Sequence, residues 1–230
     1  MPTVRGNHGT ITGDHPHGAE EVLVLRPIPL LLSLAAALTA LAGAVLVWPS
    51  GDLPGLTRDP APEVTGLSFL DHAAGDEPRE VDLLPPPGEV TVAYFGYLGC
   101  PDMCPLTMGD LRVAREQLGE DLAARTTVAF ITVDPERDDG RRIRDYLGFF
   151  FEEGYLALRA HDDDSLAAAA ERFGVRYELP EDADPDDHYE VAHTAITYVI
   201  DDTGTIVREL PFGAPPEDYT AVLRAALTDP

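Results

Sequence analysis

Beyond Pro62 the sequence alternates between two hydrophobic periods, and no other feature limits the possible folds as strongly. Short runs rich in apolar and β-branched residues, which favour strands, are separated by segments whose apolar residues recur with the period of a helix. The strand-like runs are Val64–Leu70, which is the weakest, Val90–Phe95, Thr127–Val133, Tyr155–Leu158, Ala195–Ile200 and Thr205–Leu210. This alternation predicts an α/β domain with a mixed central sheet flanked by helices.

The helical segments are located by their apolar stripes. Between residues 143 and 150 the apolar residues follow an i, i+3, i+4, i+7 pattern, and similar stripes occupy residues 166–173 and 219–227. Asp201–Gly204 has the composition of a tight turn, so the strands on either side are expected to form an antiparallel hairpin. Near-continuous apolar strands such as Ala129–Val133 suit a sheet that is covered on both faces. The element order is that of a thioredoxin-like domain.

A second feature, the apolar run Leu30–Val47, predicts a membrane helix. Its eighteen residues carry no charge and would span about 27 Å of hydrocarbon. Arg26 precedes the run, Trp48 closes it and Asp52 is the first charge after it, so the positive-inside rule places the N-terminus in the cytoplasm. The sequence therefore predicts a single-pass protein of the cell membrane with a cytoplasmic tail over 1–29, a transmembrane anchor over 30–48, a Pro/Gly linker over 49–62 and an extracytoplasmic domain over 63–230.

The alternative for this segment is a cleaved signal peptide, because Ala40–Ala42 forms an A-x-A site. Cleavage there would leave Gly43–Trp48 as an exposed apolar stub, so an uncleaved anchor is favoured. Both interpretations place the following domain outside the cytoplasm.

The chain is strongly acidic. Its 16 basic residues, all arginine, face 41 acidic residues, which gives a net charge of −25. Residues 1–51 contribute only −1 of this charge, so the domain carries nearly all of it. An acidic surface repels phosphate, and nucleic-acid binding driven by counterion release is excluded as a main function.

The chain has two cysteines, Cys100 and Cys104, within the segment YFGYLGCPDMCP that follows the first long strand. Residues at i and i+4 lie one turn apart on the same helix face, so both sulfurs can point the same way at a strand-to-helix turn. A helix N-terminus lowers the pKa of a thiol, and Pro105 suits a first helical turn. These features predict a pair of thiolates able to bind metal or to exchange disulfides.

A purely structural disulfide is the alternative for the pair. By the chain-entropy model a loop this short adds only about 2 kcal/mol, against about 4.7 kcal/mol for a loop of about a hundred residues. The domain is also long enough to hold a core without it. The structural interpretation is therefore the weaker one.

A metal site on two thiolates needs a third group. The candidate histidines of the predicted extracytoplasmic domain are His72, His161, His188 and His193. His193 directly precedes the strand-like run 195–200, and in a thioredoxin-like sheet the loop that enters this strand lies beside the cysteine-bearing turn. His193 is therefore predicted as the third ligand. His188 lies in Glu181–Glu190, which holds six acidic residues and is expected to be a solvated loop, and the other two histidines are assigned structural or surface roles.

Two sulfurs and one imidazole favour copper. This soft set with few ligands suits Cu(I) and also accepts Cu(II), whereas structural zinc normally takes four protein ligands. Met103 lies between the cysteines and is expected to contact the metal weakly at most. Met108 shares a helical stripe with Leu111 and Leu118 and is assigned to the core.

Three motifs in sequence order resemble those of the Sco/SenC copper metallochaperones. They are YFGYLGCPDMCP at residues 94–105, FITVDPERD at residues 130–138 and AHTAITYVID at residues 192–201, and the resemblance runs from about residue 64 to residue 227. It implies a membrane-anchored thioredoxin-like protein that helps to assemble the copper centre of cytochrome c oxidase, with Cys100, Cys104 and His193 as copper ligands. The implied partners are the copper-bearing oxidase subunit and an upstream copper donor. Ala192 departs from the acidic residue that many members have before the histidine.

Copper binding and delivery is the favoured function, and it needs no turnover. The alternative is a thiol-disulfide oxidoreductase in which Cys100 and Cys104 reduce a partner's cysteines before metallation. Reductases of the thioredoxin type usually have C-x-x-C and a cis-proline before the strand opposite the cysteines, whereas this chain has C-x-x-x-C and a histidine there. A peroxiredoxin-like peroxidase is a third and weaker alternative.

Overall fold

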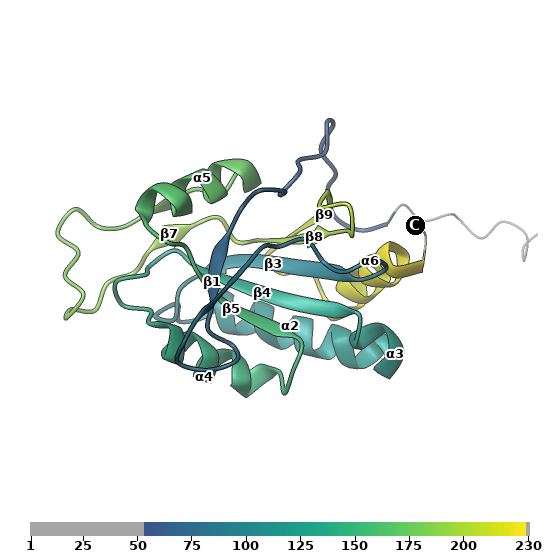
Figure 1. Ribbon diagram of the computed structural model, residues 1–230, viewed down its shortest axis with the longest axis horizontal. Helices are drawn as coiled ribbons and strands as arrows, with labels where there is room; N and C mark the ends of the chain where they lie inside the picture. The colour runs from purple at the N-terminus through teal and green to yellow at the C-terminus, as the bar shows by residue number, and fades with distance from the viewer. Residues whose placement is uncertain (1–52, 229–230) are drawn as a thin grey trace, which may run out of the picture. The chain divides into compact units, whose positions relative to one another are not determined.

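The computed structural model describes residues 53–228. Its main element is a seven-stranded sheet with the strand order β2-β1-β5-β4-β3-β8-β9 (Figure 1). The strands are β1 Phe69–Asp71, β2 Arg79–Val81, β3 Val90–Gly96, β4 Thr126–Thr132, β5 Tyr155–Arg159, β8 Ile196–Ile200 and β9 Ile206–Pro211. A separate two-stranded sheet consists of β6 Tyr177–Glu178 and β7 Ala192–His193.

The main sheet is mixed, as the sequence predicts. Strands β3, β4 and β5 are parallel to one another, whereas β1 and β8 pair with this parallel core in the antiparallel direction. Every residue of the inner strand β3 is buried, which accounts for its continuous apolar sequence. Strands β8 and β9 form the expected antiparallel hairpin, whose turn is closed by a hydrogen bond from the Gly204 N–H to the Asp201 carbonyl.

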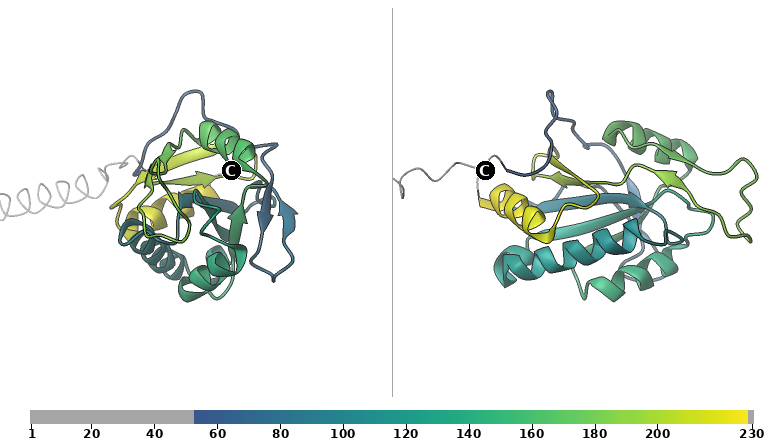
Figure 2. Two further views of the ribbon diagram at one scale, coloured as in Figure 1. Left: turned by 90° about the vertical axis from the view of Figure 1, so that its left-hand side faces the viewer. Right: turned by 180° about the vertical axis from the view of Figure 1, so that it is seen from behind.

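Helices cover both faces of the sheet (Figure 2). They are α2 Met103–Leu118, α3 Glu120–Ala123, α4 Gly140–Phe150, α5 Asp163–Phe173 and α6 Pro216–Thr228. Helix α2 packs against α4 and α6 on one face. On the other face, the ring of Phe173 in α5 meets the rings of Phe95 and Tyr198 edge to face. Because neighbouring strand residues point to opposite faces, Tyr94 of β3 faces the α2 side.

The structure differs from the sequence prediction mainly in its shortest elements. The run Val64–Leu70 contributes only two residues, Phe69 and Leu70, to the three-residue strand β1, because the chain turns at Gly66, whose φ is +83°. Before that turn, the Val64 N–H donates to the carbonyl of Gly204. Strands β2, β6 and β7 have only two or three residues each, too few to show a period.

The described part of the predicted linker, residues 53–62, runs along the edge of the sheet. Leu56 and Glu209 of β9 exchange two backbone hydrogen bonds, with N–O distances of 2.8 and 2.9 Å. The segment therefore covers part of an edge strand whose backbone groups would otherwise be unpaired.

The predicted tail and transmembrane anchor lie outside the described residues. Among the helices of residues 53–228, none combines the length and the apolar composition needed to cross a bilayer.

Candidate metal centre

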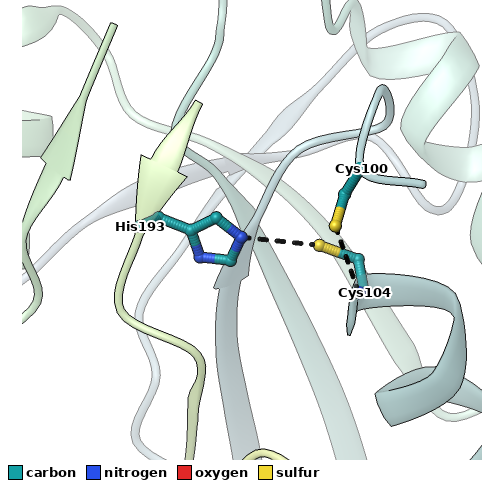
Figure 3. A group of neighbouring side chains, drawn as sticks. All are labelled: Cys100, Cys104 and His193. Carbon is teal, nitrogen blue, oxygen red and sulfur yellow. Dashed lines mark hydrogen bonds between the residues drawn. The ribbon is translucent and has the colours of Figure 1, made fainter. Parts of the chain in front are cut away.

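The two cysteines lie where the central strand passes into a helix. Strand β3 ends at Gly96, and α2 begins at Met103, whose N–H is capped by the Asp102 carboxylate at 2.6 Å. Cys104 is in the first turn of α2 and is fully buried, while Cys100 precedes the helix and is 7% exposed. The Cys104 N–H points at the Cys100 sulfur, with an N–S distance of 3.4 Å (Figure 3). Both cysteines are free thiols.

Gly96 gives Cys104 the space it occupies. A Cβ added at Gly96 would lie 2.9 Å from the Cys104 sulfur, 2.9 Å from the Tyr94 ring and 3.0 Å from the Phe130 ring. These contacts are closer than a methyl group tolerates without movement of its neighbours. The glycine at the end of β3 is therefore part of the local geometry that brings a helix sulfur over the sheet.

His193 reaches the cysteines from a separate element. It is paired with Tyr177 through the β6–β7 ladder, and its Nε2 lies 3.7 Å from the Cys104 sulfur. Its Nδ1 lies 3.2 Å from the Thr194 carbonyl. Because a carbonyl only accepts hydrogen bonds, this contact assigns the proton to Nδ1 and leaves the Nε2 lone pair directed at the sulfur. The rings of Tyr94 and Tyr97 meet the imidazole edge to face.

The structure brings all three predicted site residues together. The two sulfurs and the imidazole nitrogen lie within 4.8 Å of one another (Figure 3). Soft sulfur and imidazole donors at this spacing fit a thiophilic metal ion such as copper. That they bind a metal stays a prediction, but the adjacency of His193 to the cysteine turn is as expected.

The paired thiols have opposite acidities. A hydrogen bond from the Cys104 side chain lowers the pKa of Cys100 to about 4 against the opposing effect of burial. The same shared hydrogen bond, together with burial, raises the pKa of Cys104. In the metal-free protein Cys100 is thus the thiolate and Cys104 is the thiol that stabilises it.

A tyrosine hydroxyl also faces the Cys104 sulfur. The Tyr94 oxygen lies 3.9 Å from this sulfur, a long contact but within reach of a hydrogen bond to sulfur. Burial raises the pKa of Tyr94, so the hydroxyl keeps its proton and can donate it.

The D-P-E-R-D segment, residues 134–138, holds the cysteine turn in place. One carboxylate oxygen of Asp138 accepts hydrogen bonds from the Leu98 N–H at 3.0 Å and from the Thr132 hydroxyl at 2.7 Å. Burial raises the pKa of Asp138 to about 6. From sequence this segment has no predicted role beyond the resemblance, although a run of charged residues directly after a buried strand is a usable signal.

The remaining predicted candidates lie apart from this cluster. His72 is buried against the start of α4, where a Cβ on Gly140 would overlap its ring. His161 contacts Ser68 and Glu80, and His188 is exposed in the acidic loop. Met103 is partly buried against the core and Met108 is fully buried within it, which agrees with the core assignment of Met108.

Comparison with known proteins gives a consistent family match. The SCO1/SenC family model matches residues 69–228. An SCO2-like protein of Rickettsia conorii is 28% identical over 137 residues, which cover 60% of this chain and 65% of that protein. The mitochondrial protein SCO1 of Saccharomyces cerevisiae is 30% identical over 149 residues, or 65% of this chain and 49% of that protein. The matches thus span about half to two thirds of the length of these relatives.

A solved structure shares the fold. The structure of Bradyrhizobium japonicum ScoI with copper bound is 27% identical in sequence and superposes with a TM-score of 0.58, covering 70% of this chain and 96% of that one. The thioredoxin-like arrangement predicted from the element order is therefore shared with a structure that contains copper.

Proposed function

Because the chain belongs to the SCO1/SenC family, we propose that it is a membrane-anchored copper-binding chaperone that delivers copper to the copper centre of a cytochrome c oxidase. The observation that supports this function best is the close approach of Cys100, Cys104 and His193, whose ligand atoms lie within 4.8 Å of one another. The partners are the copper-bearing oxidase subunit and an upstream copper donor.

Copper is the metal that this ligand set and the family favour together. Thiolates select soft ions such as Cu(I), and an added imidazole also suits Cu(II). A relative that is 27% identical has been solved with copper bound, which agrees with the copper predicted from the sequence.

The burial of the three ligands suggests how copper is transferred. Both cysteines are buried, whereas His193 is only partly buried and lies on the short strand β7. An incoming ligand of the oxidase subunit would therefore reach copper from the side of His193 and replace the imidazole before the thiolates. Delivery then proceeds by exchange of ligands, with no free ion released.

The anchor Leu30–Val47 would keep this domain at the outer face of the cell membrane. Support comes from its uncharged length and from Arg26 on its N-terminal side. At this location the domain would lie where a membrane-bound oxidase exposes its extracytoplasmic copper centre.

Copper titration of the full-length reduced protein in detergent tests the proposal. With a competing Cu(I) chelator, we expect one tightly held copper per chain and a loss of affinity of about a hundredfold or more in Cys100→Ser and in Cys104→Ser. His188→Ala is the matched control, because His188 is an exposed histidine of the same domain outside the cluster. Wild-type affinity in both cysteine variants would contradict the proposal.

One observation also favours the reductase alternative. The lowered pKa of Cys100 beside the raised pKa of Cys104 is the asymmetry expected of an attacking thiolate and its resolving partner. The two functions differ in their need for the imidazole, because exchange between thiols and disulfides uses only the sulfurs.

A further inference from the structure

The side chain of Arg137 contacts both chain segments that build the site. We propose that Arg137 is a positioning residue that holds His193 against the cysteine pair and so lengthens the time that copper stays bound. This inference rests on the proposed copper-binding function, which makes the placement of His193 matter.

Arg137 fixes the end of the acidic loop that leads to His193. Its side chain is 11% exposed and forms an ion pair with the fully buried Asp134. Its Nη1 donates to the Tyr189 carbonyl at 2.9 Å, and its guanidinium carbon lies 3.3 Å from the centre of the Tyr189 ring. The Tyr189 hydroxyl in turn donates to the second carboxylate oxygen of Asp134 at 2.9 Å. The side chains of Arg137, Asp134 and Tyr189 thus form a closed ring of contacts, and Tyr189 lies four residues before His193.

The same guanidinium contacts the cysteine turn. It lies 5.8 Å from the centre of the Tyr97 ring, and the Tyr97 carbonyl accepts a hydrogen bond from the Cys100 N–H. The Tyr97 ring also meets the His193 imidazole at 5.7 Å and at a right angle. A Cβ on Gly99, the neighbour of Cys100, would lie 3.6 Å from Nη2 of Arg137. One side chain therefore contacts the supports of both Cys100 and His193.

His193 needs such an anchor because its own element is small. Strands β6 and β7 have two residues each, and residues 179–191 between them include the acidic loop Glu181–Glu190. The six acidic residues of that loop repel one another, which weakens the packing of the loop. A ligand that is already in place loses less conformational entropy when the metal binds. Loss of Arg137 should thus free the segment that carries the imidazole.

The experiment compares full-length wild type with Arg137→Gln, Arg137→Lys and Tyr189→Phe. Arg159→Gln is the matched control, since Arg159 donates to the Pro135 carbonyl of the same D-P-E-R-D segment but belongs to β5. In the copper-free proteins we measure amide hydrogen exchange over residues 189–193. In the loaded proteins we measure the Cu(II) charge-transfer spectrum and the rate of copper transfer to a chelator.

We expect Arg137→Gln to exchange its amides about tenfold faster over residues 189–193, to shift the Cu(II) band and to release copper about 10–100 times faster. Arg137→Lys should behave in the same way, because lysine keeps the charge but not the planar fork. Tyr189→Phe should show a smaller change in the same direction, and Arg159→Gln should match wild type. If Arg137→Lys exchanged its amides and released copper at the wild-type rates, the planar guanidinium would not be what holds His193 in place.

Failure of this inference differs from failure of the proposed function. If wild type holds no copper, the proposed function fails, and amide exchange still tests the positioning. If wild type holds copper and folded Arg137→Gln releases it at the wild-type rate, the inference is wrong. Should Arg137→Gln not fold, Tyr189→Phe decides, because it removes a single hydroxyl: exchange and release at wild-type rates would overturn the inference.

Discussion

Copper delivery and thiol-disulfide reduction differ in whether they need His193. A dithiol reductase needs the sulfurs of Cys100 and Cys104, whereas a copper site of this geometry uses the imidazole as well, at 3.7 Å from Cys104. Substitution of either cysteine would impair both activities and so cannot distinguish them.

We expect His193→Ala to keep thiol-disulfide exchange within about threefold of wild type while it loses the Cu(II) charge-transfer band and at least about tenfold in copper affinity. The measurements are reduction of a model disulfide and copper titration of the same protein sample. If the variant binds copper as tightly as wild type and gives the same spectrum, His193 is structural and the reductase function becomes the better one.

The acidity of Cys100 gives a second prediction for a single residue. Because its pKa is lowered to about 4, Cys100 is already a thiolate at pH 6, where an ordinary thiol is ionised to well below about one per cent. Alkylation of the reduced, metal-free protein at Cys100 should therefore have a rate that is nearly constant above about pH 5. Peptide mass spectrometry locates the modified residue.

Cys104→Ala provides the control for this pH profile. It removes the hydrogen bond that contributes most to the lowered pKa of Cys100, so the midpoint of the profile should move to higher pH. If the alkylation rate of Cys100 in the wild type instead rises tenfold per pH unit up to about pH 8, Cys100 is not a thiolate at pH 6.

At the scale of elements, Asp138 joins the end of β4 to the cysteine turn. Its carboxylate accepts from Leu98 and from Thr132, and burial raises its pKa to about 6. A carboxyl group whose pKa is raised in the folded state favours folding when protonated, so this contribution is present below about pH 4 and is lost as the pH rises through about 6.

Asp138→Asn keeps an oxygen acceptor and cannot ionise. The free energy of unfolding of the variant, relative to wild type, should therefore increase by about 1 kcal/mol between pH 5 and pH 8. Urea unfolding of both full-length proteins, followed by circular dichroism, measures this difference. Groups that titrate equally in the two proteins cancel, so a difference that is constant over this range would show that Asp138 does not bear a raised pKa.

The elements also show how far sequence alone could go. Long strands such as β3 are predictable from a continuous run of apolar residues, and helices such as α4 from an apolar stripe with the helical period. Each of these patterns is long enough to be recognised in the sequence. The two-residue strand β7, which carries His193, shows no period, because it is held by its pairing with β6. The contacts of Arg137 join residues far apart in sequence and depend on tertiary packing, so the motif was visible while its role was not.

At the scale of the whole domain, the cysteine site and the two ends of the described residues lie at opposite ends of the sheet. Leu53 and Leu227 line a common pocket with Gly88, just before β3 begins. The seven residues of β3 then lead to Gly96 beside the cysteines, a distance of about 20 Å. In Figure 1 the start of the described chain accordingly lies near α6, away from β7.

Nearly all of the net charge of the chain lies in the described domain and its flanks. The chain has a net charge of −25, and residues 1–51 carry only −1 of it. Anionic lipid headgroups repel such a surface over about a Debye length, which is about 8 Å at physiological ionic strength. An anionic bilayer would thus not bind this domain through its charge.

The last prediction tests the tether itself. If Leu30–Val47 is an uncleaved anchor with its N-terminus inside, protease added to intact spheroplasts should degrade the domain, and the undigested chain should stay with the membranes after an alkaline wash. The double substitution Leu38→Arg and Leu41→Arg is the control, because each charge near the centre of the run costs about 2.5–3.5 kcal/mol of insertion free energy. This variant should leave the membrane fraction. Protection of the wild-type domain from protease, or a mature N-terminus at Gly43, would instead show that the segment does not anchor the domain outside the cell.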